Sequence, residues 1–313
     1  AGQEEKLYLR PETAQGIFVN FLNVQKTTRQ KIPFGIAQIG KAFRNEIVAR
    51  QFIFRMREFE QMEMQFFIAP GTELDWFEKW KAQRMKWHLA LGTPANKLKF
   101  KDHDNLAHYA NAATDIQFEF PFGFKELEGI HSRTDFDLKS HQELSGKKLT
   151  YFDQEKNEAY VPYVVETSIG ADRMFLAMLS NNLKEESVPD SKGEDSTRLV
   201  FKIHPALAPV KCAVLPLVKN KEELTSKAKT IYDKLKLQFQ CQYDDKDAIG
   251  RRYRRQDAIG TPICITVDFE TLDDNCVTVR DRDTLVQQRV PIEKLSAIIA
   301  EKTDMSKVLD QLV

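Results

Sequence analysis

Three short segments of this chain combine arginine with acidic, aromatic or glycine residues in a way that could do phosphate chemistry. They are FRNE at residues 43–46, FRMREF at 54–59 and GADR at 170–173. The planar guanidinium of arginine donates two parallel hydrogen bonds to a phosphate and stays charged at any working pH. A neighbouring carboxylate can hold such an arginine in place, and an aromatic ring can stack on a base. The segments therefore predict nucleotide chemistry without a glycine-rich phosphate loop.

The first two segments resemble motif 2 of the class II aminoacyl-tRNA synthetases, and the third resembles motif 3. Three longer strings narrow the resemblance to the homodimeric type of glycyl-tRNA synthetase: LRPETAQG at 9–16, ETSIG at 166–170 and QDAIGTP at 256–262. The resemblance runs from about residue 7 to the C-terminus, and motif 1 of the family is absent from this sequence. Because the sequence also begins with Ala1 rather than methionine, we expect a fragment whose N-terminal part is missing.

The resemblance implies how the motif residues would meet ATP. Arg44 would face the α-phosphate, where negative charge grows during attack by a carboxylate and a fixed cation is worth most in the transition state. Arg57 and Arg173 would hold the outer phosphates, Phe59 would stack on adenine, and Arg44 and Arg173 are the expected catalytic residues. The whole predicted ATP site is Arg44, Asn45, Glu46, Phe54, Arg55, Met56, Arg57, Glu58, Phe59, Glu126, Leu127, Gly170, Ala171, Asp172 and Arg173.

Acidic residues are expected to bind the amino acid. The resemblance places Glu12, Glu63 and Glu166 in one pocket, with Ser168 beside them. Carboxylates can bind a free α-amino group because it is a cation. A pocket crowded with them leaves no room for a side chain, so steric exclusion would select glycine, the smallest amino acid. The whole predicted glycine site is Glu12, Phe59, Glu60, Gln61, Met62, Glu63, Glu166, Thr167, Ser168, Ile169 and Gly170.

No dedicated protein metal site is predicted. Magnesium is expected only with ATP as a substrate complex, since it bridges phosphates and needs few protein carboxylates. The six histidines show no ligand spacing such as HxxxH, although His103 and His108 are close in sequence. The four cysteines form no CxxC pair and occupy apolar, strand-like runs, which predicts buried reduced thiols in a cytoplasmic protein. No apolar run approaches the ~20 residues that span a membrane.

Composition sets wider bounds on the function. The chain has 313 residues, of which 42% are hydrophobic and 29% charged, enough for two globular domains. Lys+Arg and Asp+Glu are both 46, and this balance argues against nonspecific nucleic-acid binding. One basic run, at residues 250–255, leaves two alternatives open. Its arginines either contact tRNA or pair with nearby aspartates, and the candidate tRNA contacts are Arg251, Arg252, Arg254 and Arg255.

The elements that must position these residues divide into two regions. The pattern over 17–67 is mostly strand-like, 73–91 is a capped helix, 93–160 is irregular around further strands, and 169–183 is a helix. The polar segment 181–197 resembles a solvated linker, and strands and helices alternate from residue 210. We therefore expect a class II catalytic domain over 1–204, with an antiparallel sheet and an insertion around 70–160. A mixed α/β anticodon-binding domain would follow over 205–313.

Together the resemblance implies a homodimeric glycine–tRNA ligase that makes glycyl-adenylate from glycine and ATP and charges tRNA-Gly. Two alternatives belong to other classes. A non-catalytic synthetase-like binding protein would be expected to lack the motif arginines, which are present here. An adenylating enzyme for another small acid would not need the second domain. Glycine-dependent pyrophosphate exchange and tRNA-Gly charging distinguish the three.

Overall fold

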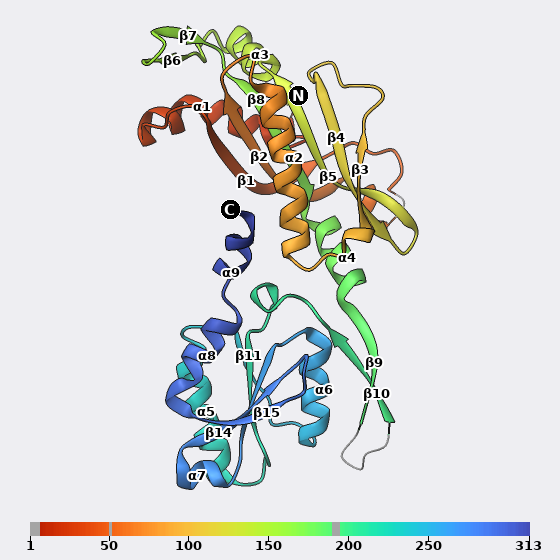
Figure 1. Cartoon of the computed structure of the whole chain (residues 1–313), viewed down its shortest axis with the longest axis vertical. Coiled ribbons are helices and arrows are strands. Elements are labelled where there is room, and N and C mark those ends of the chain that lie inside the picture. The colour runs from red at the N-terminus through yellow and green to blue at the C-terminus, as the bar shows by residue number, and fades with distance from the viewer. Residues whose placement is uncertain (1–6, 50–51, 190–194) are drawn as a thin grey trace, which may run out of the picture. The chain divides into compact units, whose positions relative to one another are not determined.

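The computed structural model describes residues 7–49, 52–189 and 195–313. The chain forms two compact units (Figure 1). Unit 1 comprises Ala1–Leu89 and Thr93–Ala177, and unit 2 comprises Ala90–Gly92 and Met178–Val313. Across the described ranges, no helix is both long enough and apolar enough to cross a bilayer.

Unit 1 is built on a six-stranded sheet with the order β1-β2-β8-β5-β4-β3. All neighbouring strands in this sheet are antiparallel, which confirms the expected sheet type. The strands are β1 (Phe34–Phe43), β2 (Glu58–Ile68), β3 (Leu98–Asp102), β4 (Ala112–Phe120), β5 (Gly123–Thr134) and β8 (Tyr163–Gly170). A separate ribbon pairs β6 (Tyr151–Asp153) with β7 (Glu158–Tyr160).

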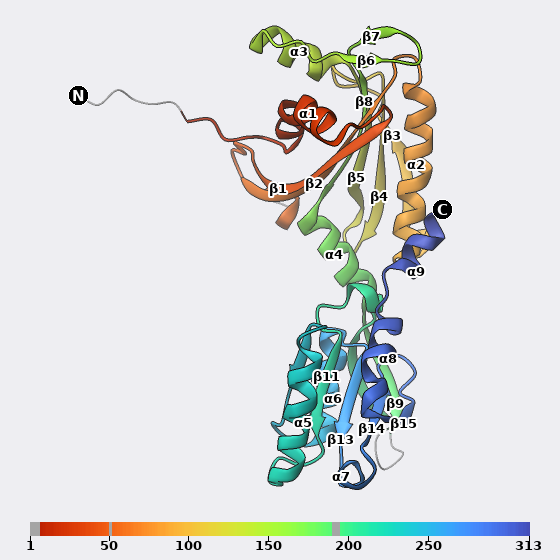
Figure 2. The ribbon, with the colours of Figure 1, turned by 90° about the vertical axis from the view of Figure 1, so that its left-hand side faces the viewer.

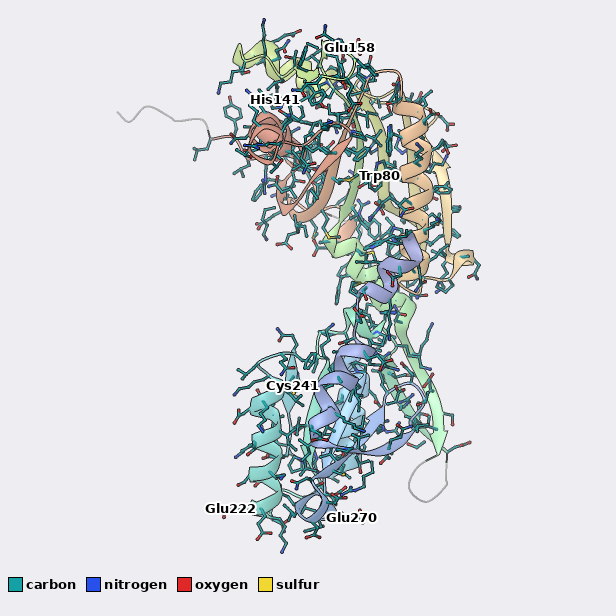
Figure 3. The ribbon with its side chains drawn as sticks, turned by 60° about the vertical axis from the view of Figure 1, so that its left-hand side comes forward. Trp80, His141, Glu158, Glu222, Cys241 and Glu270 are labelled. Atoms are coloured by element: carbon teal, nitrogen blue, oxygen red, sulfur yellow. The ribbon has the colours of Figure 1, made fainter. Side chains whose placement is uncertain are left out.

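Two helices cover opposite faces of this sheet, as Figure 2 shows. Helix α1 (Ala14–Thr28) packs on the face that carries Phe67, while α2 (Glu73–Ala90) packs on the face that carries Phe66. The two phenylalanines are adjacent in β2, so they point to opposite faces. Trp80 projects from α2, and its ring centroid lies 5.2 Å from that of Phe66 (Figure 3). A third helix, α3 (Phe136–Ser145), contacts α1 and β5.

The strand-like interpretation of residues 17–67 is wrong at its start, because Ala14–Thr28 is helix α1. The buried residues of this helix are Ala14, Ile17, Phe18 and Phe21. Their spacing is that of one helical face, and it predicts a helix more directly than a strand. Burying each of the two phenylalanines contributes about 1.5–3 kcal/mol, so this face ties α1 firmly to the sheet.

The further strands expected within residues 93–160 are confirmed, and three of them belong to the main sheet of unit 1. Strands β3, β4 and β5 all come from this region, and they form half of the sheet in unit 1. The region around 70–160 is therefore not only an insertion, since it supplies strands that neighbour β8. A register shift between Ile116 and Gln117 and the aromatic turn after Phe120 obscure the alternation in the sequence.

Unit 2 holds a five-stranded mixed sheet with the order β12-β11-β13-β14-β15. β11 pairs in parallel with β12 and β13, while β13–β14 and β14–β15 are antiparallel. The strands are β11 (Cys212–Pro216), β12 (Cys241–Tyr243), β13 (Ile263–Val267), β14 (Cys276–Asp281) and β15 (Gln287–Pro291). The helices are α5 (Glu222–Leu235), α6 (Ile249–Ile259), α7 (Glu270–Asp274), α8 (Leu295–Lys302) and α9 (Ser306–Leu309). The expected alternation of strands and helices from residue 210 is confirmed.

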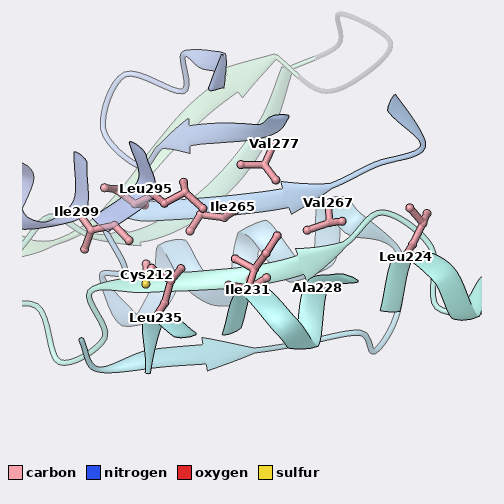
Figure 4. Close-up of a cluster of buried hydrophobic side chains, with 12 residues drawn as sticks. Cys212, Leu224, Ala228, Ile231, Leu235, Ile265, Val267, Val277, Leu295 and Ile299 are labelled. Atoms are coloured by element: carbon pink, nitrogen blue, oxygen red, sulfur yellow. The ribbon is translucent and has the colours of Figure 1, made fainter. Parts of the chain in front are cut away.

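Alternate residues of β11 enter two different cores. Cys212 and Val214 pack with residues of α5 and α8, including Ile231 and Leu295 (Figure 4). Ala213 and Leu215 pack on the other face with Ile249 and Tyr253 of α6. All four cysteines are free; Cys212 and Cys264 are buried, whereas Cys241 and Cys276 are partly exposed.

The solvated linker expected over 181–197 is wrong for the described part of that segment. After helix α4 (Ala171–Asn182), β9 (Leu183–Pro189) pairs antiparallel with β10 (Asp195–Phe201). Arg198 of β10 ties the hairpin together and to its surroundings, because it bonds to Glu186 of β9 and to Asp257 of α6. Residues 190–194 lie outside the described part. The hairpin belongs to unit 2, whose main segment starts at Met178, before the boundary expected near residue 204.

Candidate active site

A cavity of about 240 Å³ lies in unit 1 against β2, β5 and β8. Many of the predicted site residues line this one cavity, although they are scattered through the sequence. These are Glu12, Arg44, Glu46, Phe54, Arg55, Met56, Phe59, Glu60, Gln61, Glu63, Glu126, Glu166, Ser168, Gly170, Asp172 and Arg173. The two predicted sites, for ATP and for the amino acid, are therefore parts of one continuous space.

Strand alternation explains most of the predicted residues that do not line the cavity. In β8, Glu166, Ser168 and Gly170 line it, whereas the intervening Thr167 and Ile169 do not. Successive side chains of a strand point to opposite faces, so a continuous run of five residues cannot all reach one site. The predicted residues outside the cavity lining are Asn45, Arg57, Glu58, Met62, Leu127, Thr167, Ile169 and Ala171.

Arg44 and Arg173 supply positive charge to one part of the cavity. The Arg44 Nε donates to the carbonyl oxygen of Pro11 at 3.2 Å, and its guanidinium lies 5.2 Å from the ring centroid of Phe59. Arg173 donates to the carbonyl oxygens of Glu126 and Phe54 and also pairs with the Glu126 carboxylate at 3.2 Å. Arg44 has no carboxylate partner among the described residues, so its charge is available to an anion.

The other motif arginines bind the polypeptide between β1 and β2. Arg57 donates to the carbonyl oxygens of Glu46 and Ile47 at 2.9 and 3.2 Å. Arg55 pairs with the Glu46 carboxylate at 3.3 Å. Arg57 was expected to hold an outer phosphate, but in this structure its donors position the loop that carries Glu46.

Glu63 is a buried carboxylate whose negative charge has no cationic partner among the described residues. It is 4% exposed, and it accepts hydrogen bonds from the hydroxyls of Thr13 at 2.5 Å and Ser168 at 3.1 Å. No arginine, lysine or histidine among the described residues pairs with it. Burial, together with the negative charge of Glu166, raises the pKa of Glu63 to about 7. A cation that entered the cavity would meet this carboxyl group without displacing a protein cation.

Glu166 has the opposite environment, although it is also buried. His131 Nδ1 lies 2.9 Å from one carboxylate oxygen, and Arg133 and Gln65 donate to the other at 2.9 and 2.6 Å. Burial alone would raise the pKa of Glu166, but the hydrogen bond from His131 and the charge of Arg133 together lower it to about 2. Glu166 is therefore ionised, and its charge is already shared with protein donors.

Sequence reasoning missed several residues at this site. Tyr109, Gly129 and His131 line the cavity, and so does Ile53. Arg133, just behind Glu166, also bonds to Asp137 in α3 and approaches Glu12 at 3.5 Å. The alternation of β5 would have found Gly129, His131 and Arg133 if the strand itself had been predicted, since all three lie on one face.

The basic run of unit 2 is mostly engaged with the protein. Arg252 is 1% exposed and donates to the carbonyl oxygens of Pro216 and Leu217, so its prediction as a tRNA contact is wrong. Arg255 pairs with Asp244 and Asp247, while Arg254 donates to a hydroxyl of β10. Arg251, with a side chain 79% exposed, is the residue of this run that most freely faces solvent.

Comparisons with protein families account for both units. The model of the tRNA synthetase class II core domain (G, H, P, S and T) matches residues 1–182, which is more than half of the chain. The chain belongs to the class II tRNA synthetases. The model of the anticodon binding domain matches residues 211–302 of this class II synthetase chain.

Similar curated proteins carry the name glycine–tRNA ligase. The chain is 55% identical over 298 residues to that of Agathobacter rectalis and 57% identical over 297 residues to that of Chlorobaculum tepidum. Each alignment covers 95% of this chain, but only 63% and 62% of the respective relative. A third, from Clostridium perfringens, is 54% identical over 303 residues and is covered to 64%. The chain thus spans less than two thirds of the relatives that it matches.

A solved structure supports the fold at much lower identity. Prolyl-tRNA synthetase from Cryptosporidium parvum, complexed with L-proline and AMP, matches the whole of this chain with a TM-score of 0.62 at 16% identity. The match covers 65% of that chain. At this identity the match establishes the class II synthetase fold.

Proposed function

We propose that this class II synthetase chain carries the catalytic and anticodon-recognising parts of a glycine–tRNA ligase. In the first step the carboxylate of glycine attacks the α-phosphorus of ATP, forming glycyl-adenylate and releasing pyrophosphate. In the second step a hydroxyl of the terminal ribose of tRNA-Gly attacks the carbonyl carbon, forming glycyl-tRNA and releasing AMP. The catalytic role is assigned to residues 1–204 and anticodon recognition to residues 205–313.

The distribution of charge within one cavity carries this proposal. Arg44 and Arg173 line the cavity together with the buried carboxylates Glu63 and Glu166. ATP brings negative phosphates and an amino acid brings a positive ammonium group, so a single space with both signs of charge can hold the two reactants together. Bringing them together in this way removes much of the entropic cost of a bimolecular step.

On the nucleotide side, Arg44 stabilises the charge that develops on the α-phosphate. Its guanidinium already lies beside Phe59, whose ring would stack on adenine, and its bond to the carbonyl of Pro11 fixes its direction before ATP arrives. A donor that is positioned in advance costs no reorganisation during the reaction. Arg173 would bind the outer phosphates after exchanging its contact with Glu126. The Mg²⁺ that accompanies ATP would bridge phosphate oxygens as part of the substrate.

On the amino-acid side, Glu63 receives the ammonium group of glycine. Its raised pKa means that the carboxyl group gives up a proton as the cation binds. Glu166, held by His131 and Arg133, and Glu12 would border the same space and exclude larger side chains. Ser168 donates to Glu63 and fixes its orientation.

The names of the curated relatives supply the choice of glycine and of its tRNA. The same proposal includes a homodimer and a cytoplasmic location, which are properties expected of this type of synthetase. Arg251 is the residue of the basic run that we assign to tRNA contact, because its side chain is exposed. Arg254 and Arg255 would contact tRNA only after breaking their present hydrogen bonds and ion pairs within unit 2.

Amino-acid-dependent pyrophosphate exchange, followed by tRNA charging, tests this function. Glycine is expected to support exchange, while alanine and serine support far less, and only tRNA-Gly is then charged. Exchange with glycine but without charging of tRNA-Gly would favour an adenylating enzyme for a small acid. Binding of tRNA or protein without any exchange would favour a non-catalytic synthetase relative.

A further inference from the structure

Three residues with metal-binding side chains converge on the sheet of unit 1, beside the cavity. They are His103, which follows β3, Asp115 of β4 and His131 of β5. One ligand atom from each lies within 4.8 Å of the others, and no other group of three such residues meets this criterion in the described ranges. No ligand motif in the sequence indicates this group, because the three residues are too far apart along the chain.

Strand register explains why the three side chains meet. Ala113 lies opposite His131, and the amide of His103 donates to the carbonyl of Ala113 at 3.1 Å. Asp115 is two residues further along β4, so it projects from the same face as Ala113 and is a diagonal neighbour of both histidines. The pairing of β4 with β5 therefore sets the separation of Asp115 and His131, and one backbone hydrogen bond holds His103 beside them, just after β3.

An existing hydrogen bond orients the side chain of His131. His131 Nδ1 donates to the ionised Glu166 at 2.9 Å, so Nε2 is the ring nitrogen that remains for a metal once it has lost its proton. Histidine ligands in metal sites commonly have this arrangement, in which a carboxylate holds the nitrogen that does not touch the metal. A Cβ at Gly129 would lie 2.7 Å from His131 Cε1, so the glycine makes room for the ring.

We propose that His103, Asp115 and His131 bind a divalent transition-metal ion such as Zn²⁺. Two imidazoles and one carboxylate suit zinc and its neighbours, whereas Mg²⁺ and Ca²⁺ prefer sets made only of oxygen. His103 Nε2 lies 2.8 Å from Asp115 Oδ1, so a metal between them replaces one proton on His103. Ligand atoms around tetrahedral zinc are roughly 3.4 Å apart, which small side-chain rotations reach from the present separations.

The exposure of the three residues is compatible with exchange of an ion from solvent. The side chains of His103, Asp115 and His131 are 32%, 14% and 18% exposed. Three protein ligands leave a coordination position for water. Because His131 also holds Glu166, metal binding would stiffen that carboxylate; any effect on glycine rests on the proposed function.

Calorimetric titration of the 313-residue chain with Zn²⁺ alone, in the absence of ATP and amino acid, tests the site. The wild type is expected to bind one ion at this site, and Asp115→Asn and His103→Ala to weaken that event by at least about tenfold. Asp115→Asn keeps the size of the side chain, so it tests the site with the least change in packing. His108→Ala, which removes a nearby exposed histidine outside the group, is the matched control and should bind as the wild type does.

Three further readouts distinguish this site from casual binding by surface groups or thiols. Co²⁺ should give visible absorption bands in the wild type and His108→Ala that are lost in Asp115→Asn. Titrations in buffers of different ionisation enthalpy should show release of at least one proton, and Mg²⁺ should not compete. Absence of Zn²⁺ binding by the wild type, or equal affinity in His103→Ala and His108→Ala, would overturn the proposal. Both of these outcomes concern metal binding alone, so they are independent of whether the chain joins glycine to tRNA.

Discussion

Buried arginines of unit 2 and the cavity residue Arg44 of unit 1 have opposite environments. In unit 2, Arg280 binds both carboxylate oxygens of Asp257 at 2.8 and 2.9 Å, and Arg198 binds the same carboxylate at 3.0 Å. Arg282, 2% exposed, donates to the backbone carbonyls of three residues. In unit 1, Arg44 lines a cavity and binds a single backbone carbonyl.

Arginines that pair with buried carboxylates or carbonyls stabilise the fold, whereas an arginine without such partners can bind a ligand. A buried arginine whose donors are all occupied has no capacity for another anion. Arg44 and Glu63 each lack a side-chain partner of opposite charge among the described residues, and they line the same cavity. A motif in the sequence does not reveal this distinction, since Arg252 and Arg44 are both arginines in short polar segments.

The largest expected effect comes from breaking a compensated pair. Arg280→Met should destabilise unit 2 by about 3–5 kcal/mol, because it leaves Asp257 buried with one arginine fewer. Chemical denaturation, followed by circular dichroism, measures the loss. Arg251→Met, which removes an exposed arginine, is the control and should leave stability almost unchanged. Equal stability of the two variants would show that the buried pair contributes nothing to unit 2.

The second largest effect on stability is expected for Glu63, because no cationic side chain among the described residues pairs with its carboxylate. A carboxyl whose pKa is raised by folding from 4.5 to about 7 stabilises the fold fully below pH 4.5, and this contribution is lost as the pH rises through 7. A shift of this size corresponds to about 3 kcal/mol. Glu63→Gln should therefore be more stable than the wild type at pH 8, and this advantage should shrink as the pH falls towards 5.

The sign of this pH dependence distinguishes Glu63 from Glu166. Folding lowers the pKa of Glu166 to about 2, so its stabilisation is present above pH 4.5 and is lost as the pH falls through 2. Glu166→Gln should consequently be less stable than the wild type at neutral pH. If both glutamine variants responded to pH in the same direction, the contrast between the two carboxylates would be wrong.

Arg44→Ala should lower the turnover of glycine-dependent pyrophosphate exchange by about 10²-fold. The folded state should barely change, because this arginine forms one hydrogen bond to the backbone. Steady-state kinetics should show the loss in kcat, with KM for glycine nearly constant. Lys101→Ala removes an exposed positive charge elsewhere in unit 1 and should leave kcat intact. Unchanged turnover in Arg44→Ala would contradict its assignment to the α-phosphate.

The smallest effect is expected in the basic run of unit 2. Arg251→Ala should weaken tRNA charging several-fold at low salt, and the slope of log affinity against log salt should fall by about 1. Adenylate formation should not change. Arg255→Ala is the paired comparison, since this arginine is held by Asp244 and Asp247 and should affect charging less. A larger effect at Arg255 would place the tRNA contact there instead.

The sequence predicted the parts of the fold that have strong local signals. Helix α2 and the elements from β11 to α6 were found because apolar periodicity and helix-ending glycines are local features. Helix α1 was missed although Ile17, Phe18 and Phe21 share a helical face. The β9–β10 hairpin was missed because its polar residues are satisfied by Asp257, far away in sequence.

The candidate site was predictable where family motifs supplied it and less so elsewhere. A motif is a continuous run of residues, so it includes Thr167 and Ile169 although neither lines the cavity. His131 and Arg133 were not found, because their importance comes from contacts with Glu166 across two strands. The spacing of residues along one sequence does not show such contacts, because they depend on the register in which two strands pair.

The alternation of β8 has a consequence for how this chain can change over time. Glu166 and Ser168 project into the cavity, while Val165 and Ile169 are buried. Inserting or deleting one residue before Glu166 would exchange these two sets, placing carboxylate in the core and aliphatic side chains in the cavity. A substitution in this strand alters one side chain, but a change in its length alters the position of every side chain that follows and should impair the protein. Surviving insertions and deletions should therefore cluster in the loops, and a multiple alignment should remain free of gaps through 163–170.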